Sequence, residues 1–185
     1  MSDNPIQPKT SPAYIAVSGF AVLLSWILHE LSHWIAGEWL GYDMVMTLNS
    51  GYPVSRQYSQ DLHYQLISAA GPVFTLVEAL FIFVLMKKSR CVWLYPFLFT
   101  CFYMRLFATV ISFRRPNDEA RISTALGIGK FTLPILMTIV LFLMLCNISK
   151  TYGFKPKFNL LNLALVILFS SLIILADMYF KVRLL

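Results

Sequence analysis

Charged residues are scarce in this chain, and their scarcity argues against a soluble domain. They make up 13% of its 185 residues, whereas 58% are hydrophobic and 15% are aromatic. Soluble domains average about 25% charged residues. Most of the basic residues stand between long apolar runs, where lipid headgroups accommodate them. The formal net charge of +6 is therefore no sign of nucleic-acid binding, and we predict no such partner.

Cysteine and histidine are scarce as well. Cys91, Cys101 and Cys146 are odd in number, lie in or beside apolar stretches and have no CxxC spacing. This pattern is typical of small core residues and predicts neither a disulfide framework nor a cysteine-ligated metal. The chain has only three histidines, and two of them stand four positions apart.

What the chain has in plenty is long apolar runs. Five segments each approach the roughly 20 residues that a helix needs to cross about 30 Å of hydrocarbon. They cover about residues 13–36, 66–86, 91–113, 131–148 and 160–180. We predict an all-α, multi-pass integral membrane protein in a lipid bilayer. The basic residues on the two sides tie in number, so the positive-inside rule assigns no orientation.

The stretch 41–64 between the first two segments is too polar to cross a membrane. Residues 43–49 and 54–59 are predicted as short strands around a turn at 50–53, which would form a β-hairpin after the first helix. The edge of a hairpin can hold an extended peptide by strand addition. A surface loop without a substrate role is an equally good interpretation, and both stay open.

The sequence HELSH at positions 29–33 carries the chemistry. On a helix, positions i and i+4 share a face, so His29 and His33 can present two imidazoles to one zinc ion. Glu30 lies about 100° round the helix, where it can act as general base toward a water molecule. Ionisable residues inside a membrane are costly and mark functional sites by default. The motif therefore predicts a zinc site within the bilayer.

Alternating crossings would gather further polar residues at the same membrane face. The ends of the first, third and fifth segments and the starts of the second and fourth lie on that side. Gly71-Pro72, Asp118 and Asp177 are thereby placed near the two histidines. A metal site can be assembled there without any residue crossing the bilayer.

Residues 25–126 resemble the site-2-protease-like intramembrane zinc metallopeptidases. The resemblance rests on HELSH at the end of one helix, on Ala69-Ala70-Gly71-Pro72 opening the next, and on Asp118 after a third. It implies a three-helix catalytic core with one zinc ion held by His29, His33 and Asp118. The sequence departs from the family at two points. Asp118 lies in Pro-Asn-Asp-Glu rather than Leu-Asp-Gly, and Thr75 stands where the family often has asparagine.

Other residues compete for the third ligand position or have a purely structural explanation. Glu119 is the nearest competitor of Asp118, and Asn117 can cap a helix whose first turn contains both carboxylates. Asp177 is a weaker candidate because Lys181, four residues on, can pair with it. His63 lies in the polar stretch and is interpreted as a surface histidine.

Glu78 and Arg105 are the remaining charges within apolar segments. Their similar depths, counted at 1.5 Å per residue, predict a buried ion pair between the second and third segments. We interpret that pair as structural, in preference to a role in substrate binding or proton transfer.

The whole chain, residues 1–185, is predicted to be one membrane domain. It comprises a flexible lead at 1–12 without the basic stretch of a signal peptide, a catalytic core at 13–126 and two additional transmembrane helices at 127–185. The leading function is a zinc metalloprotease that cuts a membrane-protein or peptide substrate in or near a transmembrane segment. The alternative is a non-catalytic metal-binding scaffold or substrate-capture protein. A metal transporter is a third option, but the other spans lack repeated metal-ligating residues.

Overall fold

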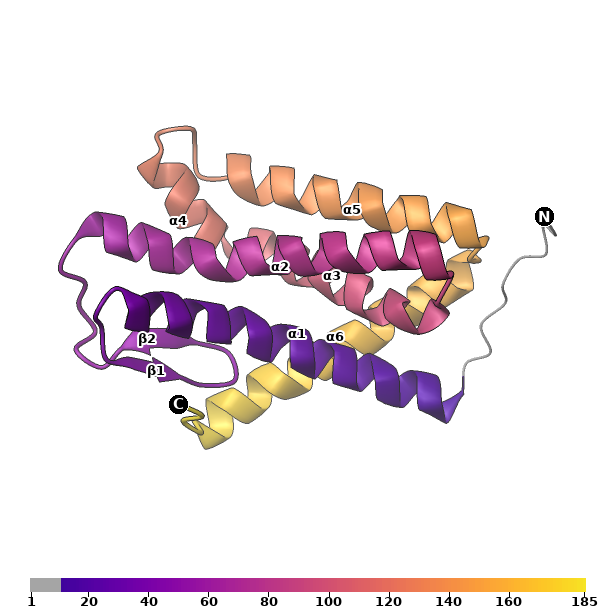
Figure 1. Ribbon diagram of the computed structural model, residues 1–185, viewed down its shortest axis with the longest axis horizontal. Helices are drawn as coiled ribbons and strands as arrows, with labels where there is room; N and C mark the ends of the chain where they lie inside the picture. Colours follow the sequence, from indigo (N-terminus) through magenta and orange to yellow (C-terminus); the bar gives the residue numbers. More distant parts are fainter. Residues whose placement is uncertain (1–10) are drawn as a thin grey trace.

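The computed structural model describes residues 11–185, so most of the lead predicted at 1–12 lies outside the described residues. Within that range the chain forms six α-helices, one short 3-10 helix and a two-stranded sheet (Figure 1). In chain order the elements are α1 (Pro12–Trp39), β1 (Met44–Met46), β2 (Gly51–Pro53), α2 (Asp61–Ser89), η1 (Val92–Leu94), α3 (Tyr95–Ile111), α4 (Asp118–Ala125), α5 (Thr132–Tyr152) and α6 (Pro156–Phe180).

Five of these helical segments are long and apolar enough to cross a membrane, as the apolar runs predict. They are α1, α2, η1 with α3, α5 and α6. Large apolar side chains on their outer faces are exposed, among them Phe81 (64%) and Leu143 (61%). Lipid, unlike water, accommodates such side chains, so the fold is consistent with a multi-pass membrane protein.

Local sequence signals set where the long helices begin and end. Ser11 caps α1 by accepting a hydrogen bond from the Tyr14 N–H, and Pro12 occupies the first helical position, where no N–H is needed. α5 ends at Gly153, which adopts the left-handed conformation that suits glycine. Pro156 then starts α6 after only a short turn.

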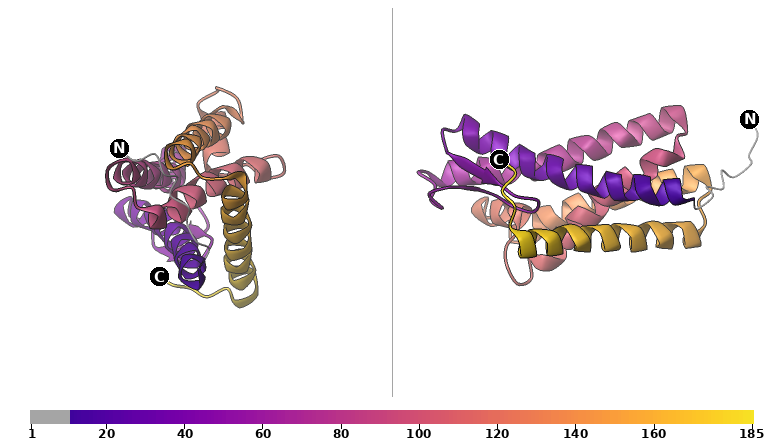
Figure 2. Two further views of the ribbon diagram at one scale, coloured as in Figure 1. Left: turned by 90° about the vertical axis from the view of Figure 1, so that its right-hand side faces the viewer. Right: turned by 90° about the horizontal axis from the view of Figure 1, so that it is seen from below.

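Buried aromatic and aliphatic side chains from α1, α2, α3, α5 and α6 form one core. α6 packs on α1 and α3, whereas α5 packs on α2, α3 and α4 (Figure 2). Buried polar bonds tie these layers together. The Tyr14 hydroxyl donates to Asn162 Oδ1 at 2.8 Å, and the Tyr152 hydroxyl donates to the Met86 carbonyl at 2.7 Å. Such bonds between helices fix which helix faces which.

The helices alternate in direction, so polar elements collect at one end of the bundle. Figure 1 shows the hairpin, α4, the start of α2 and the C-terminus at that end. The turns from α2 to α3 and from α5 to α6 lie at the opposite end. The histidine pair of α1 and the first residue of α4 therefore share one end, as the alternation predicts.

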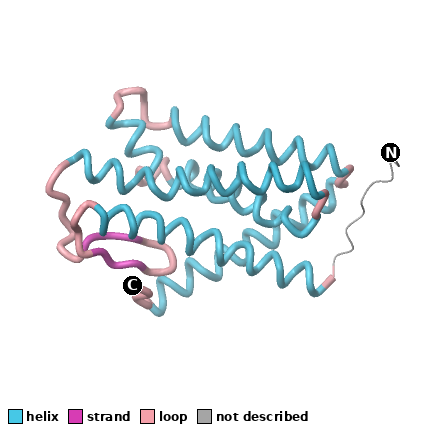
Figure 3. Tube along the Cα trace, in the orientation of Figure 1, coloured by secondary structure: helices cyan, strands magenta, loops and turns pink. Residues whose placement is uncertain are grey.

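The hairpin forms, but its turn falls earlier than predicted. β1 pairs antiparallel with β2, with Val45 opposite Tyr52 (Figure 3). The Thr47 N–H donates to the Ser50 carbonyl at 2.8 Å, and the two hydroxyls lie 2.9 Å apart, so residues 47–50 close the turn. Residues 51–53, predicted as the turn, thus form the second strand. The strand predicted at 54–59 was wrong, because Arg56 adopts a left-handed conformation there.

The C-terminal tail, residues 182–185, extends the hairpin on its outer edge. The Met46 N–H donates to the Leu185 carbonyl at 3.0 Å, and the Leu184 N–H donates to the Met46 carbonyl at 2.8 Å. The free edge of β1 is therefore covered by the chain itself, which leaves β2 as the edge strand.

Candidate metal centre

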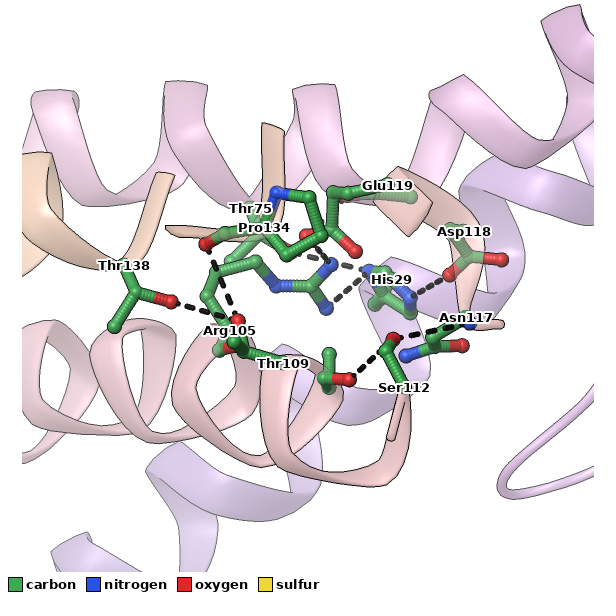
Figure 4. Close-up of polar contacts among 12 residues, drawn as sticks. His29, Thr75, Arg105, Thr109, Ser112, Asn117, Asp118, Glu119, Pro134 and Thr138 are labelled. Carbon is green, nitrogen blue, oxygen red and sulfur yellow. Dashed lines mark hydrogen bonds and ion pairs between the residues drawn. The ribbon is translucent and has the colours of Figure 1, made fainter. Parts of the chain in front are cut away.

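His29 and His33 lie one helical turn apart on α1 and face the first residue of α4. Their Nε2 atoms are 3.2 Å apart, and Asp118 Oδ2 lies 3.6 Å from His29 Nε2 and 3.5 Å from His33 Nε2. All three residues are at most 6% exposed. Figure 4 shows His29 between Asp118 and Arg105. The fold thus brings together the three residues that the motif and the resemblance select.

The spacing of these three atoms fits a zinc ion. Zinc binds imidazole nitrogen and carboxylate oxygen at about 2.0–2.2 Å in tetrahedral sites, which places neighbouring ligand atoms about 3.3–3.6 Å apart. The observed separations of 3.2, 3.5 and 3.6 Å match that value closely. Two imidazoles and one carboxylate also leave the fourth position open, as catalytic zinc sites require.

The second nitrogen of each imidazole has a hydrogen-bond acceptor. His33 Nδ1 lies 2.6 Å from the Ile67 carbonyl, so it donates to that oxygen. His29 Nδ1 lies 3.1 Å from Thr75 Oγ1, whose own hydroxyl donates to the Gly71 carbonyl. With Nδ1 protonated on both rings, each Nε2 presents a lone pair to the centre. Thr75 thus orients His29 from the position where the resembling family often has asparagine.

Gly71 allows α2 to approach the histidine pair. A Cβ atom at this position would collide with His29 Cε1 and His33 Nε2. The helix continues through Pro72, so the Gly-Pro pair does not break it. The close packing of α2 against α1 that the sequence suggests is therefore found, and Gly71 packs directly against the two imidazole rings.

Asp118 is held by partners on both of its oxygens. Arg121 pairs with Oδ1, while Oδ2 faces the two histidines. Burial alone would raise the pKa of Asp118, but the neighbouring His33 and the Arg121 guanidinium together hold that pKa well below its usual range. The side chain is therefore a carboxylate, the form that a metal ligand needs.

Glu30 lies beside the donor atoms rather than among them. It is 6% exposed, and its carboxylate accepts no hydrogen bond from residues 11–185. On the hairpin side it faces Gly51 of β2, where a Cβ atom would lie 3.8 Å from Glu30 Oε2. A buried carboxylate without a partner is free to exchange protons with a water molecule.

Two cavities, each of about 210 Å³, reach the centre from different sides. Four residues line both of them: Glu30, Asn49, Asn117 and Asp118. The first cavity is polar and is bordered by the hairpin, the start of α2 and α4. The second is bordered by the polar residues of the centre on one side and by apolar side chains of α1, α3 and α6, such as Trp26, Met104 and Ile174, on the other. The centre therefore borders two cavities whose linings differ in polarity.

Arg105 pairs with Glu119, and the predicted Glu78–Arg105 pair was wrong. Arg105 Nη1 lies 2.6 Å from Glu119 Oε1, and both side chains are at most 4% exposed. Glu78 instead accepts a hydrogen bond from Ser25 at 2.6 Å. The reason is that α4 folds back onto α2 and α5, which carries Glu119 inward to Arg105. Glu119, the main competitor of Asp118, is thus engaged outside the donor group.

The remaining candidates also lie outside the donor group. Asp177 accepts a hydrogen bond from the Leu48 N–H at 3.0 Å, and His63 lies 3.0 Å from the Tyr42 hydroxyl. Asn117 takes the predicted N-cap position of α4, but its side chain makes no capping bond there. It instead lines both cavities.

Sequence reasoning had no role at the centre for Asn117, Thr75, Arg105 or Arg121. Only the position of Asn117 beside Asp118 gave a signal that it belongs to the site. In comparisons with known proteins, no family model, no curated sequence and no solved structure matches this chain.

Proposed function

We propose that the protein is an intramembrane zinc metalloprotease that hydrolyses a peptide bond in or near a transmembrane segment of its substrate. One observation carries the proposal. His29, His33 and Asp118 present three donor atoms at zinc spacing, and an unpartnered Glu30 carboxylate lies beside them. This combination of two imidazoles, a carboxylate ligand and a separate acid is typical of zinc hydrolases.

The residues of the chain have distinct roles in this proposal. Bound zinc supplies a Lewis acid that polarises the scissile carbonyl and makes a water molecule more acidic. Glu30 takes the proton from the attacking water and returns it to the departing amide nitrogen. Asn117, which borders both cavities, offers its amide to the bound peptide. Thr75 and the Ile67 carbonyl keep the two imidazoles in the ligating orientation.

The two cavities suggest how substrate and water meet. The cavity between α1, α3 and α6 has an apolar part of its wall that suits a chain arriving from the bilayer, and the polar cavity suits water from the face of the membrane. A helical substrate must unwind first, because its backbone groups are bonded to each other. Since the tail already covers β1, any strand addition to the hairpin takes place on β2, where Gly51 borders the polar cavity.

The test is to measure zinc content and cleavage of a panel of transmembrane substrates by the purified protein in detergent. We expect Glu30→Gln to retain zinc and to lose at least about 100-fold in cleavage rate, the usual contribution of a general base. Glu78→Gln is the matched control, because Glu78 is an intramembrane glutamate outside the metal centre. It should cleave at the wild-type rate.

The outcomes separate the alternatives. Equal cleavage by wild type and Glu30→Gln contradicts the proposed mechanism. Stoichiometric zinc without cleavage in any variant favours the non-catalytic metal-binding scaffold. Absence of zinc from the wild-type protein contradicts both.

A further inference from the structure

A large apolar groove lies on the outside of the bundle, away from the metal centre. It has a volume of about 520 Å³ and runs between α3, α5 and α6. Its walls are aromatic and aliphatic, and include Phe99, Phe102, Phe142, Leu145 and Leu163. Phe142 is 49% exposed, so the groove opens sideways, where the bilayer would lie. The groove shares no lining residue with either cavity at the metal centre.

The groove extends over about half of the membrane thickness. Its polar end is marked by Tyr95 and Lys150, and its deep end by Leu106 and Phe142. At 1.5 Å per residue, Tyr95 and Leu106 are about 16 Å apart along α3, and Phe142 and Lys150 about 12 Å apart along α5. Half of a hydrocarbon core is about 15 Å. The groove therefore matches the length of the acyl chains in one leaflet, and it ends near the bilayer centre.

Hydrogen-bonded polar side chains close the outer end of the groove. The Tyr95 hydroxyl donates to Asn159 Oδ1 at 2.9 Å, and Asn159 Nδ2 donates to Ser149 Oγ at 2.8 Å. Lys150 borders the same end and is exposed. No carboxylate in residues 11–185 lies within ion-pair distance of its ammonium group.

The membrane face at this end of the groove carries only positive charge in the described part of the chain. The charged residues at the C-terminal end of α2 and around the α5–α6 turn are all basic: Lys87, Lys88, Arg90, Lys150, Lys155 and Lys157. All acidic side chains of residues 11–185 lie elsewhere, at the opposite end or, for Glu78, within α2. At a membrane surface a basic residue attracts an anionic headgroup with about 1 kcal/mol, and of these six residues only Lys150 lines the groove.

We propose that this groove is a binding site for an anionic phospholipid. One acyl chain lies in the groove, and the phosphate lies at Lys150 beside the Ser149–Asn159 pair. A transmembrane helix suits the groove less well, because it is 10–12 Å wide and crosses both leaflets, whereas the groove stops halfway. The proposal assigns a task to α5 and α6, and it does not depend on proteolysis.

The test compares phosphatidylglycerol with phosphatidylcholine of the same acyl chains, added to delipidated full-length protein in detergent. Native mass spectrometry counts the lipids that each protein retains. We expect wild type to retain phosphatidylglycerol about fivefold more tightly, the factor that corresponds to about 1 kcal/mol. Lys150→Gln should abolish this preference. Lys157→Gln, a basic residue of the same face that does not line the groove, should retain it.

Filling the groove gives a second, independent variant. Cys146→Phe places a larger side chain in the wall, so we expect it to reduce retention of both lipids. Glycerol phosphate, which has the headgroup charge but no acyl chain, should not displace the bound lipid.

Three results would overturn the proposal. The first is equal retention of the two lipids by wild type, and the second is an unchanged preference in Lys150→Gln. The third is that an uncharged transmembrane peptide displaces the lipid from wild type and does not bind to Cys146→Phe. The groove would then be a surface on which helices dock.

Discussion

Gly71 lies against both imidazoles, so the side chain at this position controls whether they can converge on one ion. Adding a methyl group forces the rings apart or pushes α2 away from α1. Overpacking of this kind costs about 1–3 kcal/mol. We therefore expect Gly71→Ala to weaken zinc binding about tenfold or more, measured by competition with a chelator in detergent.

Gly19→Ala is the matched control for this substitution. Gly19, like Gly71, lies within a long helix (α1 rather than α2), but the nearest atoms to its added methyl group belong to the outer end of the Phe169 ring, 3.1 Å away, which can move. This variant should bind zinc like wild type. Wild-type zinc affinity in Gly71→Ala would show that the close approach does not position the histidines.

The Arg105–Glu119 pair controls the charge beside His29. Arg105 Nη2 lies 3.4 Å from His29 Nδ1, so removing the Glu119 carboxylate leaves an uncompensated buried cation next to a zinc ligand. We expect Glu119→Gln to weaken zinc binding about 10- to 100-fold, the effect usual for residues that support metal ligands. The same chelator competition measures this loss.

A double variant distinguishes this indirect effect from direct ligation. Arg105→Gln combined with Glu119→Gln removes both charges, so zinc affinity should return to within a few fold of wild type. Asp118→Asn should lose zinc with or without Arg105→Gln. If the double variant binds no better than Glu119→Gln alone, Glu119 is itself a ligand and the assignment of Asp118 fails.

At the scale of elements, the sequence predicts the long helices well and the short elements less well. Twenty apolar residues in a row leave few alternatives to a membrane helix, so the five segments are found within a few residues of their predicted ends. The hairpin turn was displaced because Thr47 and Ser50 close it with their own hydroxyls, ahead of the glycine and proline that usually mark a turn.

The hairpin depends on the C-terminal tail as well as on its own two strands. Three backbone hydrogen bonds join Met46 to Leu184 and Leu185, and a typical bond of this kind contributes about 1 kcal/mol. Removing residues 182–185 should therefore raise the rate of amide hydrogen exchange at Met46 about tenfold or more, while the long helices exchange as before. Mass spectrometry of peptides covering β1 measures this change.

The control for the truncation is Val182→Ala, which leaves the backbone of the tail in place and should preserve protection. Unchanged exchange at Met46 after truncation would mean that the tail does not hold β1 in solution.

At the scale of the whole molecule, how well the sequence predicts a contact depends on how far apart in the chain the two residues lie. The spacing of His29 and His33 is local, so it identifies two donor atoms directly. The position of Asp118 depends on alternation of the helices, which hydropathy predicts. The partner of Arg105 depends on how deeply α4 folds back, and no periodic signal encodes that depth. The prediction that Glu78 pairs with Arg105 was therefore wrong, because it compared depths within the apolar segments alone and left out α4, which carries Glu119.

The division of the metal centre between α1 and α4 also has a consequence for biogenesis. His29 and His33 are synthesised 85 or more residues before Asp118, so they enter the membrane long before their third partner exists. Two imidazoles alone make an incomplete site. Under the proposed function, capture of the ion requires the insertion of α2 and α3 and the docking of α4, so a partly inserted chain holds only two of the three donor residues.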